Sequence, residues 1–208
     1  MRRPLAIRIL SIVVVILSLG IGTKGTVSAT HPFDPPFRLV GLHPLPNGTA
    51  YYSLCTTDPA TQWLWAWGPE SWETATGGAM RFTLSSVACN INSQEQIQWE
   101  GYFFCGENAF ACHIRYEMSW HKDPTYGNHS NVYKAKIVWD ANAWAITTNS
   151  QRRAASAHEM GHGMSLEDHE ADACGELTIM GYIGNQVCYE QPTFWDAIAA
   201  QGAYGYFG

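Results

Sequence analysis

Charged side chains, and basic ones above all, are scarce in this amino-acid sequence. Lys, Arg, Asp and Glu together supply 14% of the 208 residues, with 12 basic against 18 acidic side chains. Because a general nucleic-acid binder needs a basic face to displace phosphate counterions, we exclude that class. A disordered chain is excluded as well, because 46% of the residues are hydrophobic and favour burial in a core.

Internal repeats and low-complexity tracts are also absent. The 9 Trp, 10 Tyr and 8 Phe residues are spread along the whole chain, as expected for a single core. A chain of this length supports one well-packed domain but not two. We therefore expect one catalytic or binding domain that acts as a monomer.

The apolar run at residues 9–21 is shorter than the roughly 20 residues that a membrane span needs. Basic residues precede it, and Val27 and Ala29 occupy the third and first positions before Thr30. This layout is typical of a secretory signal peptide, residues 1–29, with an uncleaved membrane anchor as the alternative. Its removal takes away four of the 12 basic residues and none of the 18 acidic ones, so the net charge changes from −6 to −10. We predict a secreted, extracellular protein without membrane attachment after cleavage.

Zinc-finger spacing is absent among the six cysteines, all of which lie beyond residue 29. An even number of cysteines in an oxidising compartment is typical of disulfides, although six cysteines allow fifteen pairings. Pairing of neighbours along the chain closes short loops, which limit the entropy of the unfolded state. The disulfides predicted in this way are Cys55–Cys89, Cys105–Cys112 and Cys174–Cys188.

Residues 30–48 carry five prolines and no helical periodicity, which predicts an extended arm ahead of a domain spanning residues 49–208. Within that domain, aromatic residues near helical spacing predict a helix at about 60–76, which Gly68 and Pro69 should break or kink. Runs of aromatic and β-branched residues separated by Asn, Ser and Gly predict strands. These strands are 81–87, 96–104, 113–120 and 132–139, the last of them at a sheet edge.

A second helix is predicted at about 151–164, where the chain is rich in alanine and free of proline, with Ser150 as its N-cap. It contains an H-E-x-x-H pattern at His158, Glu159 and His162. Because residues four apart lie on one face of a helix, both imidazoles can bind one metal ion. The carboxylate beside them can take a proton from a metal-activated water that attacks a carbonyl, which predicts a hydrolase.

The residues after His162 extend this pattern. Residues 158–168 follow H-E-x-x-H-x-x-G-x-x-H/D, the signature of the metzincin metallopeptidases, with Ser165 at the glycine position. Residues 178–182, Thr-Ile-Met-Gly-Tyr, resemble a Met-turn. The chain therefore resembles a metzincin, and residues 166–169, Leu-Glu-Asp-His, most resemble the snapalysin group, in which aspartate replaces the third histidine.

The resemblance implies an α+β, metzincin-like fold with a twisted mixed sheet, an active-site helix and a small C-terminal subdomain. It also implies three Zn²⁺ ligands, His158, His162 and Asp168. Glu159 would be the general base, and Met180 would form a floor beneath the metal. Tyr182 would contact zinc or stabilise the oxyanion, unless it is a buried core residue. Two imidazoles, one carboxylate and an open fourth position favour zinc over other metals.

The third ligand has alternatives. Ser165 lacks the conformational freedom of the family's glycine, so a different turn that brings His169 to the metal is the alternative to Asp168. A glutamate on a later helix, as in thermolysin-like enzymes, is disfavoured because Glu190 is soon followed by Pro192.

We therefore predict a secreted zinc metalloendopeptidase that hydrolyses peptide bonds through a metal-activated water. A peptide or protein substrate would add along the predicted edge strand, residues 132–139. The alternative is a secreted binding module in which the metal is structural and nothing is hydrolysed. Glu159 argues against that alternative, because a structural zinc site typically has four protein ligands and no use for a carboxylate beside an open position.

Overall fold

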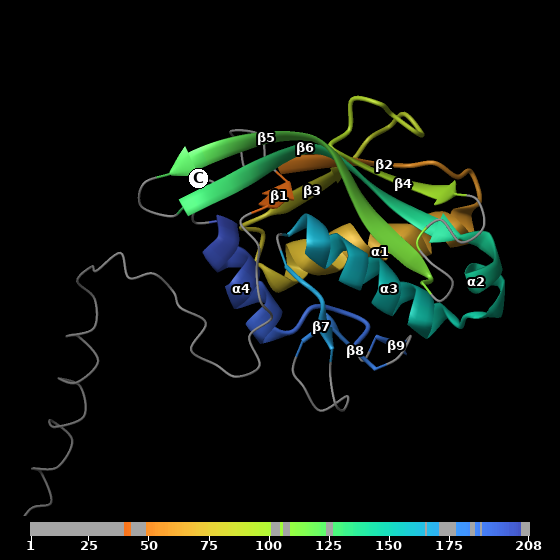
Figure 1. The fold of residues 1–208 in the computed structure, drawn as a ribbon. Helices are drawn as coiled ribbons and strands as arrows, with labels where there is room; N and C mark the ends of the chain where they lie inside the picture. Colours follow the sequence, from red (N-terminus) through yellow and green to blue (C-terminus); the bar gives the residue numbers. More distant parts are fainter. Residues whose placement is uncertain are drawn as a thin grey trace, which may run out of the picture.

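The computed structural model describes residues 40–42, 49–100, 105, 109–123, 127–164, 166–170, 178–183, 186–187 and 189–204. The predicted signal peptide, most of the predicted arm and the cysteines Cys174 and Cys188 lie outside these residues. In the described part, a twisted sheet lies over a layer of helices (Figure 1). Among these helices, none is long and apolar enough to cross a membrane.

The centre of the sheet is the long strand β6 (Gly127–Asp140). On one side, β1 (Val40–Leu42) and β4 (Glu95–Glu100) pair with it in parallel. On the other side, β5 (Ala111–Asp123) runs antiparallel to β6 along almost its whole length. No other described strand pairs with β5, which therefore forms one edge of the sheet. The prediction that residues 132–139 lie at the edge is wrong.

Residues 133–137 of β6, Tyr-Lys-Ala-Lys-Ile, alternate between apolar and basic side chains, and this pattern does not come from an edge position. Ala135, Ile137 and Trp139 are buried on the face that meets the helices. Lys136 between them is half-buried on the other face, with its Nζ 5.4 Å from the centroid of the Tyr116 ring. Such alternation shows that one face of a strand is covered, but it does not show whether the strand has neighbours on both sides.

The sheet continues beyond β4 with β2 (Thr49–Leu54) and then β3 (Arg81–Leu84), both paired in parallel. The strands predicted at 81–87, 96–104 and 113–120 are confirmed as β3, β4 and β5; the bounds of β3 and β5 differ by a few residues, and residues 101–104 lie outside the described part of the chain. Neither β1 nor β2 was predicted. Since β1 lies inside the segment predicted to be an arm, part of that segment belongs to the sheet.

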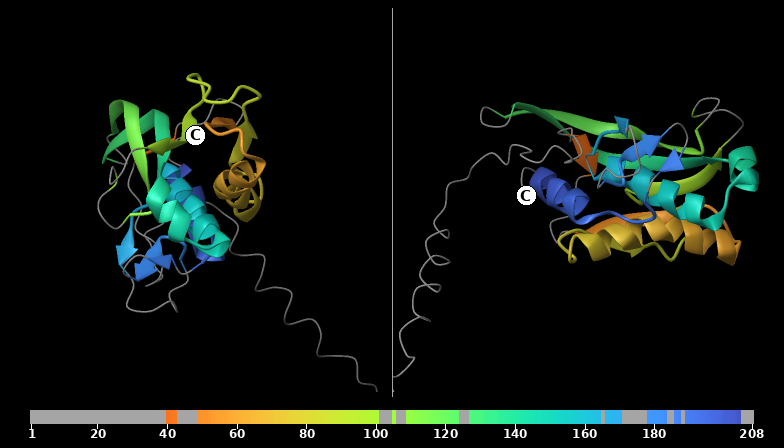
Figure 2. Two further views of the ribbon diagram at one scale, coloured as in Figure 1. Left: turned by 90° about the vertical axis from the view of Figure 1, so that its right-hand side faces the viewer. Right: turned by 90° about the horizontal axis from the view of Figure 1, so that it is seen from below.

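Helices α1 (Pro59–Ala75), α3 (Asn149–Gly163) and α4 (Phe194–Tyr204) lie beneath the sheet, and α2 (Ala141–Ile146) connects β6 to α3. Seen from below, α1 and α3 lie side by side (Figure 2). The helix predicted at 60–76 is confirmed, and it continues through Pro69.

Gly68 serves the contact between α1 and α3. A Cβ atom on this residue would lie 2.5 Å from the carbonyl oxygen of Ser156, so only glycine permits so close an approach. The backbone N–H of Gly68 donates to Ser156 Oγ at 3.1 Å, and Trp72 Nε1 donates to the carbonyl oxygen of Ala157 at 2.8 Å. These bonds fix α3 against α1.

The helix predicted at about 151–164 is confirmed as α3, but its N-cap is Thr148 and not Ser150. Thr148 and Gln151 form a capping box, in which Gln151 N donates to Thr148 Oγ1 and Thr148 N donates to Gln151 Oε1. The box satisfies two backbone groups at once, which a serine two residues later does not. The Thr-x-x-Gln spacing was the readable signal.

The chain after residue 168 forms a small C-terminal part. It contains a three-stranded sheet of β7 (His169–Glu170), β8 (Gly181–Ile183) and β9 (Gln186–Val187), followed by α4. The twisted mixed sheet, the helix with the metal motif and this smaller part confirm the predicted α+β class. The disulfides Cys55–Cys89 and Cys105–Cys112 are confirmed as well.

Candidate metal centre

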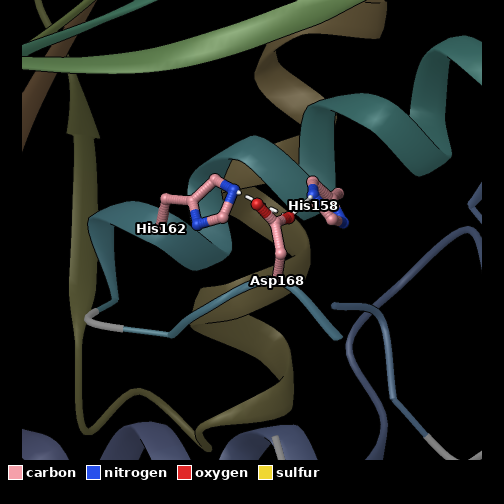
Figure 3. Close-up of side chains that lie close together, drawn as sticks. All are labelled: His158, His162 and Asp168. Atoms are coloured by element: carbon pink, nitrogen blue, oxygen red, sulfur yellow. Dashed lines mark hydrogen bonds and ion pairs between the residues drawn. The ribbon is translucent and has the colours of Figure 1, made fainter. Parts of the chain in front are cut away.

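The last two turns of α3 present His158, Glu159 and His162, and the chain then turns back to bring Asp168 beside them. Two backbone hydrogen bonds close this turn, from Met164 N to the Met160 carbonyl and from Leu166 N to the Gly161 carbonyl, each 3.0 Å long. The Asp168 carboxylate therefore faces both imidazoles (Figure 3).

One carboxylate oxygen, Asp168 Oδ1, lies 3.0 Å from His158 Nε2 and 3.4 Å from His162 Nε2. All three donor atoms lie within 4.8 Å of one another. Tetrahedral zinc with bonds of about 2.0–2.1 Å holds neighbouring donor atoms roughly 3.3 Å apart. The spacing of the three side chains thus fits a single zinc ion.

The orientation of the two rings fits as well. His158 Nδ1 donates to the carbonyl oxygen of Ile179 and His162 Nδ1 donates to that of Leu166, each at 3.0 Å. A proton held on Nδ1 leaves the Nε2 lone pair for a metal, and the backbone acceptor fixes the direction of the ring.

Charges in the site favour a cation. Burial lowers the pKa of His158, but the hydrogen bond that its ring donates to Asp168 and the negative charges of Glu159 and Asp168 outweigh it and raise that pKa above its usual value. Hydrogen bonds from His158 and His162 hold the pKa of Asp168 well below its usual range. A group of donors that attracts a proton in this way also attracts a metal ion.

Glu159 lies beside the three donors without being one of them. Its side chain is buried, and its Oε2 is 4.0 Å from His162 Nε2. The candidate ligand group of His158, His162 and Asp168 does not include Glu159, whose carboxylate lies next to it, in the position that a general base would need.

The segment 178–180 lies beneath the last turns of α3, as the resemblance implies for a Met-turn. A Cβ atom on Gly161 would overlap Met180 Sδ, so Met180 packs directly against the helix backbone. The same segment supplies the Ile179 carbonyl that orients His158. Met180 therefore forms part of the floor beneath the two histidines.

Asp196 of α4 holds this floor in place and was missed by the sequence analysis. Its fully buried carboxylate accepts hydrogen bonds from Thr178 Oγ1 at 2.6 Å, from Ile179 N at 2.8 Å and from Thr193 N at 2.7 Å. Asp196 N in turn donates to Thr193 Oγ1 at 3.3 Å. The Thr-x-x-Asp spacing at the start of α4 is a capping box, the signal that could have located this helix.

Two further predicted residues are described only through their backbones. His169 lies in β7 opposite Gly181, and Tyr182 lies in β8 opposite Glu170, so both are near Asp168 and Met180 in the chain. Their side chains lie outside the described part of the chain. The roles of Tyr182, and of His169 as the alternative ligand, stay predictions.

Comparison with known proteins adds little. No protein family matches the sequence, and no curated protein does. A solved structure described as that of myroilysin is 11% identical, with a TM-score of 0.41, over 78% of this chain and 95% of that chain. A likeness at this identity and TM-score does not indicate a shared function.

Proposed function

We propose that the protein is a secreted zinc metalloendopeptidase of the metzincin type that its sequence resembles. The observation that carries this proposal is the convergence of His158 Nε2, His162 Nε2 and Asp168 Oδ1, with the buried Glu159 carboxylate beside them. Three protein ligands and a neighbouring carboxylate are typical of catalytic zinc sites, whereas structural sites usually have four protein ligands. The assignment to the snapalysin group rests on Asp168 alone.

Each residue of the site has a distinct task in peptide hydrolysis. Zinc, when bound, polarises the scissile carbonyl and lowers the pKa of water. Glu159 accepts a proton from the attacking water and passes it to the amine that leaves. Tyr182 is proposed to donate a hydrogen bond to the oxyanion.

The substrate surface proposed here is β5. In the described part of the chain, this strand has a paired side towards β6 and no strand on its outer side, so an extended peptide can add there. β5 also contacts α3, and its side chains His113 and Arg115 reach the neighbourhood of His162. A peptide along β5 would therefore pass near the metal centre.

Secretion is proposed on chemical grounds. The described residues contain two disulfides, and disulfides form and persist mainly in oxidising compartments outside the cytosol. The signal-peptide pattern of residues 1–29 points the same way.

Casein digestion by the purified protein, with and without a chelator, tests the proposed activity. We expect hydrolysis that the chelator abolishes and that added zinc restores. If the zinc-loaded protein leaves casein and a mixture of unstructured peptides intact, the alternative, a binding module with a structural metal, is favoured.

A further inference from the structure

Three polar side chains of the sheet meet in the layer between the sheet and α3. Glu95 lies on β4, and His113 and Arg115 lie on β5. Glu95 and Arg115 are both paired with Ala135 of β6, one on either side of it. Because laterally paired residues project from the same face and alanine is small, the two longer side chains extend over Ala135. His113 Nε2 is 2.9 Å from Glu95 Oε2 in the same layer.

Two of these side chains are fully buried and Arg115 is half-buried, and the three differ in charge. The side chains of Glu95 and His113 are 0% and 1% exposed. Burial, helped by the positive Arg115, holds the pKa of His113 well below its usual value, and burial raises the pKa of Glu95 although Arg115 opposes that rise. The guanidinium keeps its charge at any relevant pH. Arg115 is thus the one lasting positive charge of the three side chains.

Arg115 reaches from the sheet to the metal helix. Its Nη2 donates to the carbonyl oxygen of His162 at 2.9 Å. The His162 carbonyl lies in the last turn of α3, where carbonyl groups lack the regular helical donor four residues on, and a cation there also matches the negative end of the helix dipole. His162 is therefore held twice, by Arg115 at its backbone and by the Leu166 carbonyl at its ring.

We propose that Arg115 is a positioning residue that sets the direction of the His162 ring towards the metal, with Glu95 and His113 as the buried support of its guanidinium. The inference rests on the proposed function, because His162 needs this direction only if it binds zinc. It also means that the strand to which a substrate would add is bonded directly to a metal ligand. A displacement of β5 is thereby transmitted to His162.

The positive charge of Arg115 could also act on zinc binding in the opposite direction, and a measurement of zinc affinity distinguishes the two effects. A positive charge near the site repels a dication, so its removal by charge alone would tighten zinc binding. Positioning predicts the reverse sign. Arg115→Met removes both charge and hydrogen bond, whereas Arg115→Lys keeps the charge and one donor but lacks the planar fork and reach of arginine.

The experiment uses zinc alone as the probe, with its affinity measured by competition with a chromophoric chelator. We expect Arg115→Met to weaken zinc binding about tenfold, the lower end of the effect of groups that orient metal ligands, and Arg115→Lys to weaken it less. Arg153→Met is the matched control, since Arg153 lies on α3 but pairs with Glu190 on another side of the helix. It should bind zinc as the wild type does.

Two further readouts separate positioning from general destabilisation. The absorption bands of the cobalt-substituted protein should change in Arg115→Met and return towards those of the wild type in Arg115→Lys. A purely structural role would lower the melting temperature of the metal-free protein and leave these bands unchanged. If Arg115→Met does not fold, Arg115→Lys decides, and wild-type zinc affinity and bands in that variant overturn the proposal.

Unchanged or tighter zinc binding by a folded Arg115→Met variant also overturns the proposal, without touching the proposed activity. By contrast, failure of the wild type to bind zinc refutes both the activity and the role of Arg115.

Discussion

The two halves of α3 are held by different kinds of contact. In the N-terminal half, Arg152 stacks over Trp144, with 4.3 Å between its Cζ and the ring centroid. Arg153 stacks over Trp67 at 5.1 Å and pairs with Glu190. These contacts lie at or near the surface, where water and salt weaken charge interactions. None of them orients a donor atom of the candidate metal centre.

The C-terminal half is held by buried contacts, and each of these sets a direction. His158 is bonded to the Ile179 carbonyl, the His162 carbonyl accepts from Arg115, and Met180 packs against Gly161. We conclude that substitutions in the N-terminal half should change the free energy of unfolding alone. Those in the C-terminal half should also change metal binding and turnover.

The largest effect is expected for Asp168→Ala, which removes one of the three proposed ligands and should weaken zinc binding by several orders of magnitude. His169→Ala is the matched control and should keep its zinc, with a modest change in activity. Metal analysis after dialysis measures both. Zinc retained by Asp168→Ala but lost by His169→Ala would make His169 the ligand and contradict the assignment.

Glu159→Gln should lower turnover at least about a hundredfold, because it keeps the shape of the side chain and removes the base. Zinc content and melting temperature should remain those of the wild type. Glu70→Gln, on the exposed side of α1, serves as the control for handling and charge. Full activity of Glu159→Gln would refute the mechanism.

Asp196→Ala removes the carboxylate that accepts from two buried donors, Thr178 Oγ1 and Ile179 N, and from the partly buried Thr193 N. We expect a loss of about 2–4 kcal/mol in the free energy of unfolding, since each unsatisfied buried group costs roughly 1–3 kcal/mol and partial relaxation is common. Zinc affinity should fall as well, because the Ile179 carbonyl orients His158. Asp196→Asn, which keeps one acceptor oxygen, should lie between. Urea unfolding measures the stability, and competition with a chelator measures the zinc affinity. If Asp196→Ala is destabilised but binds zinc as tightly as the wild type, the segment 178–180 does not direct His158.

Gly161→Ala places a methyl group against Met180 Sδ, and 3.2 Å from Cζ2 of Trp72. Overpacking of this kind costs about 1–3 kcal/mol of stability, measurable by urea unfolding. Met180→Ala in the same chain should relieve part of the strain, so that the two substitutions together cost less than the sum of each alone. Simple additivity would contradict the contact.

The smallest effect is expected for Arg153→Met. It removes a partly exposed ion pair with Glu190 and the stacking on Trp67, together worth about 1 kcal/mol or less. Thermal unfolding should register this loss only at low salt, while zinc affinity stays unchanged. A weakened zinc site in this variant would abolish the distinction between the two halves of α3.

Local patterns predicted a good part of the fold. The start of α1 could be predicted from Asp58 and Pro59. Asp58 caps the helix through a hydrogen bond within its first turn, and proline is favoured at the first helical position, so both signals are local. The strands that became β3, β4 and β5 were readable from short runs of aromatic and β-branched residues. By contrast, β2 was missed because its sequence alternates little between polar and apolar residues. A buried parallel strand has no polar face and so gives no such alternation.

The sequence by itself determined the chemistry of the metal motif. His158 and His162 share a face of α3 because a helix repeats every 3.6 residues, so their meeting needs no information from elsewhere in the chain. Glu159 follows for the same reason. The resemblance to the metzincin signature limited the candidates for the third ligand to Asp168 and His169. Local sequence rules do not choose between two adjacent residues on a turn.

Only the tertiary structure decided what surrounds that motif. Glu95 and Arg115 meet over Ala135 because β4 and β5 pair with opposite sides of β6, and pairing over long sequence separations leaves no local signal. The edge position of β5 has the same origin. Asp196 reaches Ile179 from a helix at the far end of the chain, through packing that depends on every element between them.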